Sequence, residues 1–545
     1  MNCSTIDPKT SINQLARLPA FAFIVLAGLA LLPAPNAFGV TPAPDGGYSG
    51  ANTAEGTNAL FQLSSGINNT AIGFAALDNE TTGSGNTALG YTALENQRGN
   101  SNNTALGAAT LVTNSGDENT AAGAFALSGN GSGSANTALG FDALLGNSGS
   151  FNTAVGDSAL ESNSGSSGTA VGVQALAHNT ANGNTATGYQ ALTTNSSGNS
   201  NTADGTSALA RNTTGSSNTA TGIAALFANT SGNNNTANGA DALFNNTQGV
   251  ENTATGVNAL LSNTTGGDNT ATGDGALESN IGGGNNTANG AFALFSNTNG
   301  AFNTANGDVA LHNNTSGSSN TAVGIQALSK NISGSDNTAV GALAGQNLTT
   351  GNNNIDIGAN VFGVAGESSK IRIGKQGTQN GTFIAGIFGV AISGSTVVVN
   401  SNGKLGVATS SARFKEAIKP MDKASEAILA LKPVSFRYKE EVDPEGIPQF
   451  GLIAEDVEKV IPDLVGRDEH GKVSTVRYEA VNAMLLNEFL KEHRKVQEQA
   501  ATILRLEKDM QTVVAHLKEQ DSRIQKVSAQ LELAKAPAQL VTNNQ

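Results

Sequence analysis

A repeat of 16 or 17 residues fills the middle of this 545-residue chain and restricts what the chain can fold into. Its unit is Asn-Thr-Ala-x-Gly-x-x-Ala-Leu-x-x-x-Asn, followed by a turn rich in glycine and serine. Eighteen copies align on a threonine, from Thr53 to Thr338. The glycine three residues after this threonine is present in every copy. The leucine seven residues after it is missing only in the last copy, where Gly345 stands.

This period predicts a mainly β chain, with a long repeat β-solenoid over residues 51–350. Sixteen or 17 residues are too few for a pair of helices, and glycine and asparagine both disfavour helix. We expect one coil per copy, made of two short strands, Thr-Ala-x-Gly and x-x-Ala-Leu, with Ala and Leu facing inward. Stacked asparagines are expected to form hydrogen-bonded ladders. Eighteen coils at about 4.8 Å each make a rod on the order of 85 Å long.

The unit also resembles the left-handed parallel β-rolls in the heads of trimeric autotransporter adhesins, although those repeats are usually shorter. That resemblance implies a left-handed roll that assembles as a trimer. The residue before each corner glycine faces the same side of its strand as the threonine. Two interpretations of this position stay open: a face that packs between protomers at both ends of the rod, or drift among copies. It is mostly apolar near the ends (Ile72, Leu89, Leu106, Leu139, Val155, Val171, Val323, Val340) and polar between them (Thr187, Asp204, Thr221, Asn238, Thr255, Thr272, Asn289, Asn306).

Charge is distributed unevenly along the chain. Residues 51–350 contain 17 acidic and three basic residues, which accounts for the whole net charge of −14. An acidic shaft argues against nucleic acid as a partner. The five histidines of the chain are scattered singly, so we expect neither a metal site nor a bound cofactor.

The first 39 residues read as a signal peptide. A start that carries Lys9 and Arg17 precedes an apolar run over 20–32, and Ala37 and Gly39 are small residues suited to cleavage after Gly39. An uncleaved membrane anchor is the alternative. With the signal removed we expect no membrane span, and Cys3, the one cysteine, leaves with it. The chain is therefore expected to be exported, to an extracellular or cell-surface location. Residues 40–50, which follow the signal, are expected to form a Pro/Gly linker.

In residues 351–409 the repeat gives way to runs rich in β-branched residues, which predict a β neck. Four runs rich in β-branched residues read as strands, and Asn402-Gly403 is a strong two-residue hairpin signal. The runs are 355–358, 371–374, 383–386 and 396–399, with 404–407 after the hairpin.

The last part of the chain predicts a small α+β domain over 410–480 and a helix over 481–535, followed by a tail over 536–545. Short helices are expected over 423–431 and 455–460, with a strand over 434–438 between them. In the long helix apolar residues recur every seven positions, which favours a coiled coil. A helix folded against its own domain is the alternative. The heptad residues are Phe489, Val496, Ile503, Met510, Leu517, Ile524 and Leu531, and their partner positions three residues later include Glu492, Gln499, Leu506, Val513, Gln520 and Val527.

Four motifs in residues 410–465 resemble a known family. Ser410-x-x-Arg413-x-Lys415-x-x-Ile418 looks like the start of the C-terminal intramolecular chaperone domain of phage tail spikes and fibres, the self-cleaving serine peptidase type. The similarity continues through residues 431–438, 451–457 and 461–465. It implies a homotrimer that is cut between Thr409 and Ser410 after it assembles.

In that family the pair equivalent to Ser410 and Lys415 is the catalytic dyad. A serine hydroxyl is a weak nucleophile that needs a base, and Lys415 can act as one only in its uncharged form. Arg413 is expected on the same side of an extended segment, where a second cation would favour that form. The sequence departs from the family at Ser411, where the family commonly has Asp. The alternative is an inert serine-rich linker with surface Lys and Arg side chains.

Two classes of function follow from these features. The first is an exported trimeric fibre, adhesin-like, whose chaperone domain drives assembly and cleaves itself off; its receptor, a host surface or a glycan, is not named by the sequence. The second is a tail-spike-like enzyme that degrades polysaccharide and carries the same chaperone. Such an enzyme needs paired carboxylates in a groove and aromatic platforms for sugar. The repeats contain no tryptophan and only two tyrosines, Tyr91 and Tyr189, which favours the fibre.

Overall fold

The computed structural model describes residues 48–535, apart from 380, 386, 388–392, 401 and 469. The expected signal peptide, Cys3 and the tail over 536–545 lie outside these residues. The described residues form two compact units, divided between Thr382 and Phe383.

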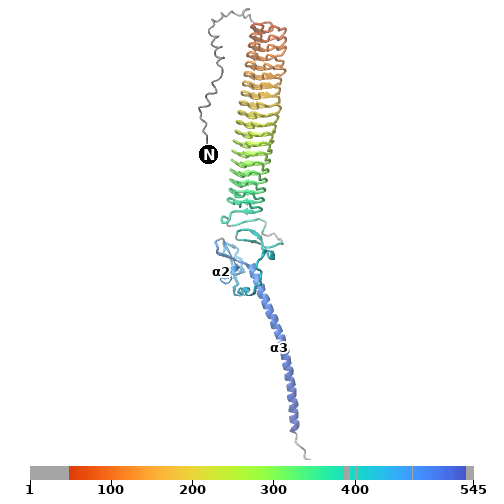
Figure 1. The fold of residues 1–545 in the computed structure, drawn as a ribbon, viewed down its shortest axis with the longest axis vertical. Coiled ribbons are helices and arrows are strands. Elements are labelled where there is room, and N and C mark those ends of the chain that lie inside the picture. The colour runs from red at the N-terminus through yellow and green to blue at the C-terminus, as the bar shows by residue number, and fades with distance from the viewer. Residues whose placement is uncertain are drawn as a thin grey trace, which may run out of the picture. The chain divides into compact units, whose positions relative to one another are not determined.

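The first unit is a parallel β-solenoid whose coils stack one on another (Figure 1). Each of the 18 repeat copies contributes one three-residue strand to a single 20-stranded sheet, and equivalent residues pair, as Thr219 pairs with Thr236. The predicted repeat solenoid is therefore confirmed. The repeat strands are β1 (Thr53–Glu55), β2 (Thr70–Ile72), β3 (Thr87–Leu89), β4 (Thr104–Leu106), β5 (Thr120–Ala122), β6 (Thr137–Leu139), β8 (Thr153–Val155), β10 (Thr169–Val171), β12 (Thr185–Thr187), β13 (Thr202–Asp204), β14 (Thr219–Thr221), β15 (Thr236–Asn238), β16 (Thr253–Thr255), β17 (Thr270–Thr272), β18 (Thr287–Asn289), β19 (Thr304–Asn306), β20 (Thr321–Val323) and β21 (Thr338–Val340).

The sheet continues beyond the last copy into residues assigned to the neck. Strand β22 (Ile355–Ile357) pairs with β21 in the same parallel register, and β23 (Ile371–Ile373) pairs with β22. The two strands predicted there thus belong to the solenoid sheet, whereas residues 383–385 form no strand.

The second strand expected in each copy, x-x-Ala-Leu, is wrong. These residues form turns, in which the fifth and seventh residues after the threonine have left-handed backbone, as in Ala224 (φ 53°) and Leu226 (φ 53°). A left-handed residue cannot continue an extended strand. The return side is strand-like only where copies are 16 residues long, in β7 (Gly146–Asn147), β9 (Ser162–Asn163) and β11 (His178–Asn179).

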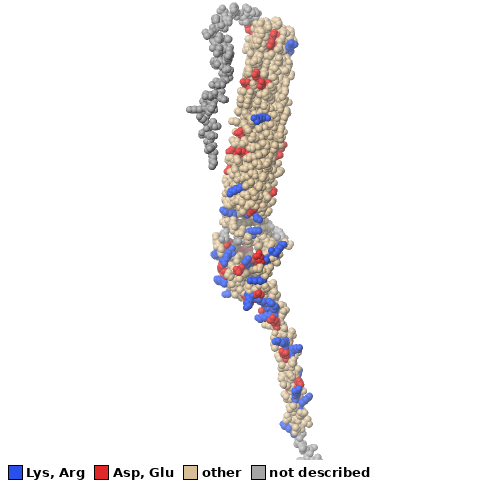
Figure 2. Space-filling model, viewed as in Figure 1, with Lys and Arg blue, Asp and Glu red and all other residues tan. Residues whose placement is uncertain are grey.

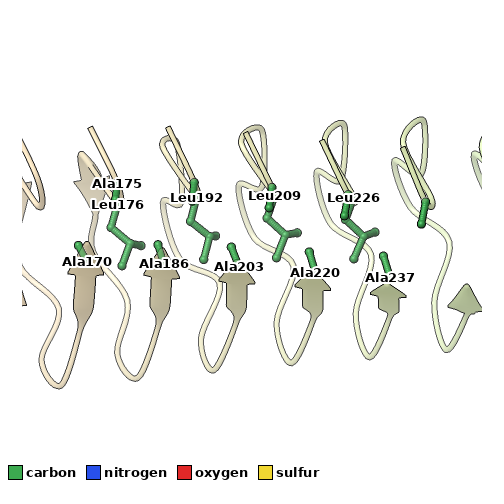
Figure 3. Packing of buried hydrophobic residues seen from close by; sticks show 14 of the residues in the cluster. Ala170, Ala175, Leu176, Ala186, Leu192, Ala203, Leu209, Ala220, Leu226 and Ala237 are labelled. Carbon is green, nitrogen blue, oxygen red and sulfur yellow. The ribbon is translucent and has the colours of Figure 1, made fainter. Parts of the chain in front are cut away.

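The inward-facing alanines and leucines form one continuous core (Figure 3). In the coils drawn, the strand alanine and the turn leucine point toward each other, as Ala220 and Leu226 do, and these two residues are completely buried. All 17 of these leucines have φ between 51° and 55°. Left-handed backbone costs a residue with a Cβ about 1–2 kcal/mol, and burying a leucine contributes about 1.5–3 kcal/mol. Core packing therefore outweighs the backbone strain.

The corner glycines are needed for two separate reasons. Gly222, in the middle of the solenoid, has φ 127°, which side-chain-bearing residues rarely adopt. A Cβ on this residue would lie only 2.6 Å from the carbonyl oxygen of Gly239 in the next coil. The same close approach recurs along the solenoid, which explains a glycine in every copy.

Two columns of buried asparagines run along the solenoid, as the repeat predicts. In the first, which Gly168 interrupts once, the asparagine before the threonine ties three coils together: the Asn235 backbone N–H donates to Asn218 Oδ1 at 3.0 Å, and Asn235 Nδ2 donates to the Gly249 carbonyl at 2.8 Å. In the second column each amide donates to the preceding one, as Asn246 Nδ2 does to Asn229 Oδ1 at 3.0 Å. Every side-chain dipole in this second column therefore points the same way.

The second column has a different residue at each end. At its N-terminal end Glu80 replaces asparagine and is completely buried. Its carboxylate accepts hydrogen bonds from the backbone N–H groups of residues 81–83 and 99 and from the Gln97 side chain. At the other end Asn331 Oδ1 has no partner among the described residues, because Leu348 takes the next position. The Glu80 carboxylate thus accepts the hydrogen bond at the donor end of the column. At the acceptor end the next position is held by an apolar residue, Leu348.

The last coils replace core alanine with charged residues. Asp356 and Arg372 occupy the register positions after Ala339, and Asp356 is completely buried. Arg372 makes a two-pronged ion pair with Glu367 and lies 3.5 Å from Asp356 Oδ1. Burial raises the pKa of Asp356 above its ordinary value of 3.8, an effect that Arg372 only partly offsets.

The described residues of the second unit form three antiparallel strand pairs, three short 3-10 helices and two α-helices. Its small core joins Ile428, Val457, Leu464, Val476 and Met484 with their neighbours. The elements are β24 (Val397–Val399), β25 (Leu405–Val407), η2 (Ala412–Phe414), η3 (Asp422–Ala430), β26 (Val434–Phe436), β27 (Gln449–Gly451), α2 (Ala454–Val460), η4 (Pro462–Leu464), β28 (Val465–Arg467), β29 (Val473–Val476) and α3 (Tyr478–Ala534).

Helix α3 is a single 57-residue helix, as the heptad pattern predicts. The alternative of a helix folded on its own domain holds for its first turns, because Val481 and Met484 are buried in the core of the unit. From Phe489 onward the heptad residues are 51–67% exposed. The coiled coil itself stays a prediction.

Figure 2 shows few charged side chains on the visible face of the solenoid and many over the second unit and α3. Within the described ranges, no helix is long and apolar enough to cross a membrane. The same residues contain no group of three or more His, Cys, Asp or Glu side chains arranged to hold a metal ion.

Removing a core leucine is expected to destabilise the solenoid strongly. Leu226→Ala leaves a cavity between two coils and should lower the free energy of unfolding by about 2–5 kcal/mol, which urea denaturation measures. Ile223→Ala is the matched control, because Ile223 belongs to the same coil but is 62% exposed. It should change the stability by only about 0.5 kcal/mol. Equal effects of the two substitutions would contradict the assigned core.

The stabilities of the two units are expected to change in opposite directions as the pH falls. Burial raises the pKa values of Asp142, Glu278 and Asp356 in the solenoid above their ordinary values of 3.8 and 4.5. A raised carboxyl pKa gives stability that is complete below the ordinary value and lost as the pH rises through the folded-state pKa. Hydrogen bonds from Lys459 and Lys491 lower the pKa values of Asp456 and Glu488 in the second unit. That stability is present above the ordinary values and lost as the pH falls through the folded-state pKa.

Calorimetry from about pH 7 to 3 tests this expectation. The unfolding temperature of the solenoid should rise as the pH falls toward about 4. The unfolding temperature of the second unit should decrease once the pH is below about 4.5. Asp356→Asn should flatten the rise. A solenoid transition that falls between pH 7 and 4 would contradict the prediction.

Candidate auto-processing site

The candidate cleavage site follows a β-hairpin in the second unit. Strands β24 and β25 pair antiparallel, and Asn400 Oδ1 closes their loop by accepting from the backbone N–H groups of Asn402 and Lys404. The hairpin predicted around Asn402-Gly403 is thus present, with Gly403 in left-handed backbone at φ 75°. Strand β25 ends at Val407, so the chain leaves a defined element two residues before Thr409.

A 3-10 turn brings the two expected dyad residues together. In η2 the Lys415 backbone N–H donates to the Ala412 carbonyl at 3.0 Å, which turns the chain back on itself. Lys415 Nζ consequently donates to Ser410 Oγ at 3.2 Å. Both side chains are exposed in the single chain. A nucleophile and a candidate base at hydrogen-bond distance are the first geometric requirement for nucleophilic catalysis.

The turn also corrects the expected position of Arg413. The segment is not extended there, and the Arg413 guanidinium lies over the Phe414 ring, 4.6 Å from its centre. Such a cation–π contact holds the charge at the ring. Arg413 is therefore positioned by its neighbouring phenylalanine and not by an extended run shared with Lys415.

The other motif residues build the core behind the site. Val457 is 1% exposed, and Leu464 and Val465 are also buried, while Leu431 and Leu452 pack against them. Gly451 leaves room for the Tyr478 hydroxyl, which would lie 2.7 Å from a Cβ at this position. That hydroxyl accepts a hydrogen bond from the Leu452 backbone N–H at 3.0 Å. The motifs therefore describe how this unit packs against the start of α3.

Four polar residues for which the motifs give no indication meet between η3 and α3. They are Ser425, Asn487, Glu488 and Lys491. The only signal in the sequence is the spacing of the last three with Val481 and Met484, which puts all five on one face of the helix.

Comparison with known proteins locates one similarity. Residues 410–466, about a tenth of the chain, match the peptidase family model described as chaperone of endosialidase. No curated protein and no solved structure matches the chain. The match begins at Ser410, the residue from which the site was built. It confirms the resemblance predicted from the sequence: a chaperone-of-endosialidase domain follows a long β-solenoid.

Proposed function

We propose that this chain is an exported, adhesin-like trimeric fibre whose C-terminal domain drives assembly and then cuts the chain between Thr409 and Ser410. The solenoid followed by a chaperone-of-endosialidase domain fits a tail-fibre- or spike-like protein. The observation that carries the proposal is the 3.2 Å contact between Lys415 Nζ and Ser410 Oγ at the first residue of the family match.

The cleavage chemistry needs only groups of this chain and water. Lys415 takes the proton from Ser410 Oγ, which attacks the carbonyl carbon of Thr409. The Thr409–Ser410 peptide bond breaks, an ester forms on Ser410 Oγ, and the freed α-amine takes up the proton. Water then hydrolyses the ester, which leaves a carboxylate on Thr409 and restores the Ser410 hydroxyl.

Assembly supplies a reason for the timing of this reaction. In the single chain Ser410 and Lys415 both face solvent. Contact with neighbouring protomers would withdraw the pair from water, and loss of solvent favours the uncharged form of an amine. Cutting would then follow trimer formation.

Two exposed apolar rows support the trimer. On α3 the heptad residues from Phe489 to Leu531 form a row that no described segment covers, and a second and third copy of the helix would cover it. On the solenoid sheet the residues before the corner glycines are exposed and apolar toward both ends, including Leu89, Leu139 and Val340. We assign this face to contacts between protomers in a left-handed β-roll.

The alternative enzyme, a tail-spike-like polysaccharide depolymerase, is separated from the fibre by an activity assay. Purified chain incubated with bacterial surface polysaccharides should release no oligosaccharide. Release of fragments would favour the enzyme.

Aspartate in the α3 row is expected to dissociate the assembly. Ile503→Asp with Leu517→Asp places two charges per chain in a desolvated seam, which is strongly unfavourable. Light scattering of the full chain at several concentrations should show a trimer for the wild type and a monomer for this variant. Ala501→Asp with Ala515→Asp adds the same charges almost opposite the seam and should leave the trimer intact. A monomeric wild type at micromolar concentration would remove the proposed assembly.

Loss of either dyad residue is expected to keep the chain whole. Freshly made wild-type protein should give a C-terminal band on denaturing electrophoresis, of about a quarter of the chain, and sequencing of that band should begin at Ser410. Ser410→Ala and Lys415→Ala should give no such band, whereas the control Ser411→Ala should be cut normally. A wild-type trimer that stays intact, or a cut abolished only by Ser411→Ala, would refute the assignment.

A further inference from the structure

A partly buried polar cluster joins the short helix η3 to α3. Ser425 of η3 is completely buried. Its hydroxyl donates to Glu488 Oε1 and accepts from Asn487 Nδ2 at 2.7 Å. Lys491 Nζ completes the group, 2.7 Å from Glu488 Oε1 and 3.5 Å from Ser425 Oγ. These four residues are called the Ser425 cluster.

The Ser425 cluster is not a second catalytic dyad. Hydrogen bonds from Lys491 and Ser425 lower the pKa of Glu488, and the bond to Glu488 raises the pKa of Lys491. The ion pair with Glu488 therefore favours the charged form of Lys491, which is not the form that a base needs. The hydroxyl of Ser425 is committed to Glu488 and closed off from solvent, so the cluster connects two elements.

The cluster also holds a strained residue at the start of η3, the end of this helix that follows the candidate site in the chain. Asp422, the first residue of η3, has φ 42°, which is unfavourable for a residue with a Cβ. Its carbonyl oxygen lies 3.2 Å from Asn487 Nδ2 and 3.3 Å from Ser425 Oγ. Asp422 lies seven positions after Lys415 in the chain. The direction in which the chain enters η3 from Lys415 therefore depends on contacts made by the cluster.

The cluster and the heptad row lie on opposite faces of the same turns of α3. At 100° per residue, Asn487, Glu488 and Lys491 share one face with the buried Val481 and Met484. Phe489, the first residue of the heptad row, points the other way and is 66% exposed. One helix can thus hold partner chains on one side and η3 on the other.

We propose that the Ser425 cluster makes cutting at Ser410 depend on the assembly of α3, a regulatory role that rests on the proposed function. When α3 is fixed in a bundle, the cluster fixes η3 and the left-handed Asp422 against it. The segment from Ser410 to Lys415 is then held in the geometry, already present in the single chain, that places Nζ next to Oγ. Ser425, Asn487 and Glu488 are positioning residues, because they act on the dyad through the backbone.

Ser425→Ala in the full chain tests the proposal, with Lys491→Ala as a second variant that leaves the Ser425 side chain in place. The matched control is Lys459→Ala in α2, which removes the same kind of ion pair, Lys459–Asp456, also at 2.7 Å and three residues apart. Three quantities are measured: the trimer by light scattering, hydrogen exchange of the η3 amides, and the rate of cutting by electrophoresis.

Both cluster variants should stay trimeric, exchange their η3 amides faster, and be cut about tenfold more slowly. The control should match the wild type in all three. Cluster variants that are trimeric, exchange faster in η3 and are cut at the wild-type rate would overturn this inference alone. Loss of the trimer would overturn it too, because the cluster would then serve assembly. A wild-type trimer that is never cut would refute the proposed function, and this inference with it.

Discussion

The solenoid depends on one requirement: each coil must present to the next the same backbone groups at the same height. Strands of three residues cannot form a stable sheet by themselves. They persist because equivalent residues pair in parallel over 20 coils and because the corner glycines let successive carbonyl groups approach closely. Any residue with a Cβ at these corners would push two coils apart. Regularity is therefore a condition of stability in this unit.

The ends of a regular stack need different chemistry from its middle. A hydrogen-bonded column always leaves one unmatched donor end and one unmatched acceptor end. Glu80 accepts five donors at the first end, and Leu348 replaces asparagine at the second. The buried Asp356 and the Arg372 beside it then put charge where alanine stood. These residues end the regular repeat near the two ends of the stack.

Much of the solenoid could be predicted because 18 copies show which positions are restricted. The turn conformation of x-x-Ala-Leu was missed, since alternation of inward and outward residues resembles a strand. A signal was nevertheless present: the inward position is Leu in 17 of the 18 copies and is never Val or Ile, although a strand core readily accepts both. Residues branched at Cβ, such as Val and Ile, tolerate left-handed backbone badly. At the site, the Ser410–Lys415 spacing was visible in the sequence. The Ser425 cluster was not, because its members come from segments more than 60 residues apart.

The identity of the middle copies has a consequence for the size of the molecule. Residues that differ from the repeat, such as Glu80 and Leu348, occur once each near the two ends, while the copies between them are interchangeable in register. Removing or duplicating one whole 17-residue copy would keep the backbone register between neighbouring strands and would leave both ends unchanged. The number of copies encoded in the gene therefore sets the length of the solenoid. Its reach can change by one coil at a time, with no redesign of the parts that begin it, end it or follow it.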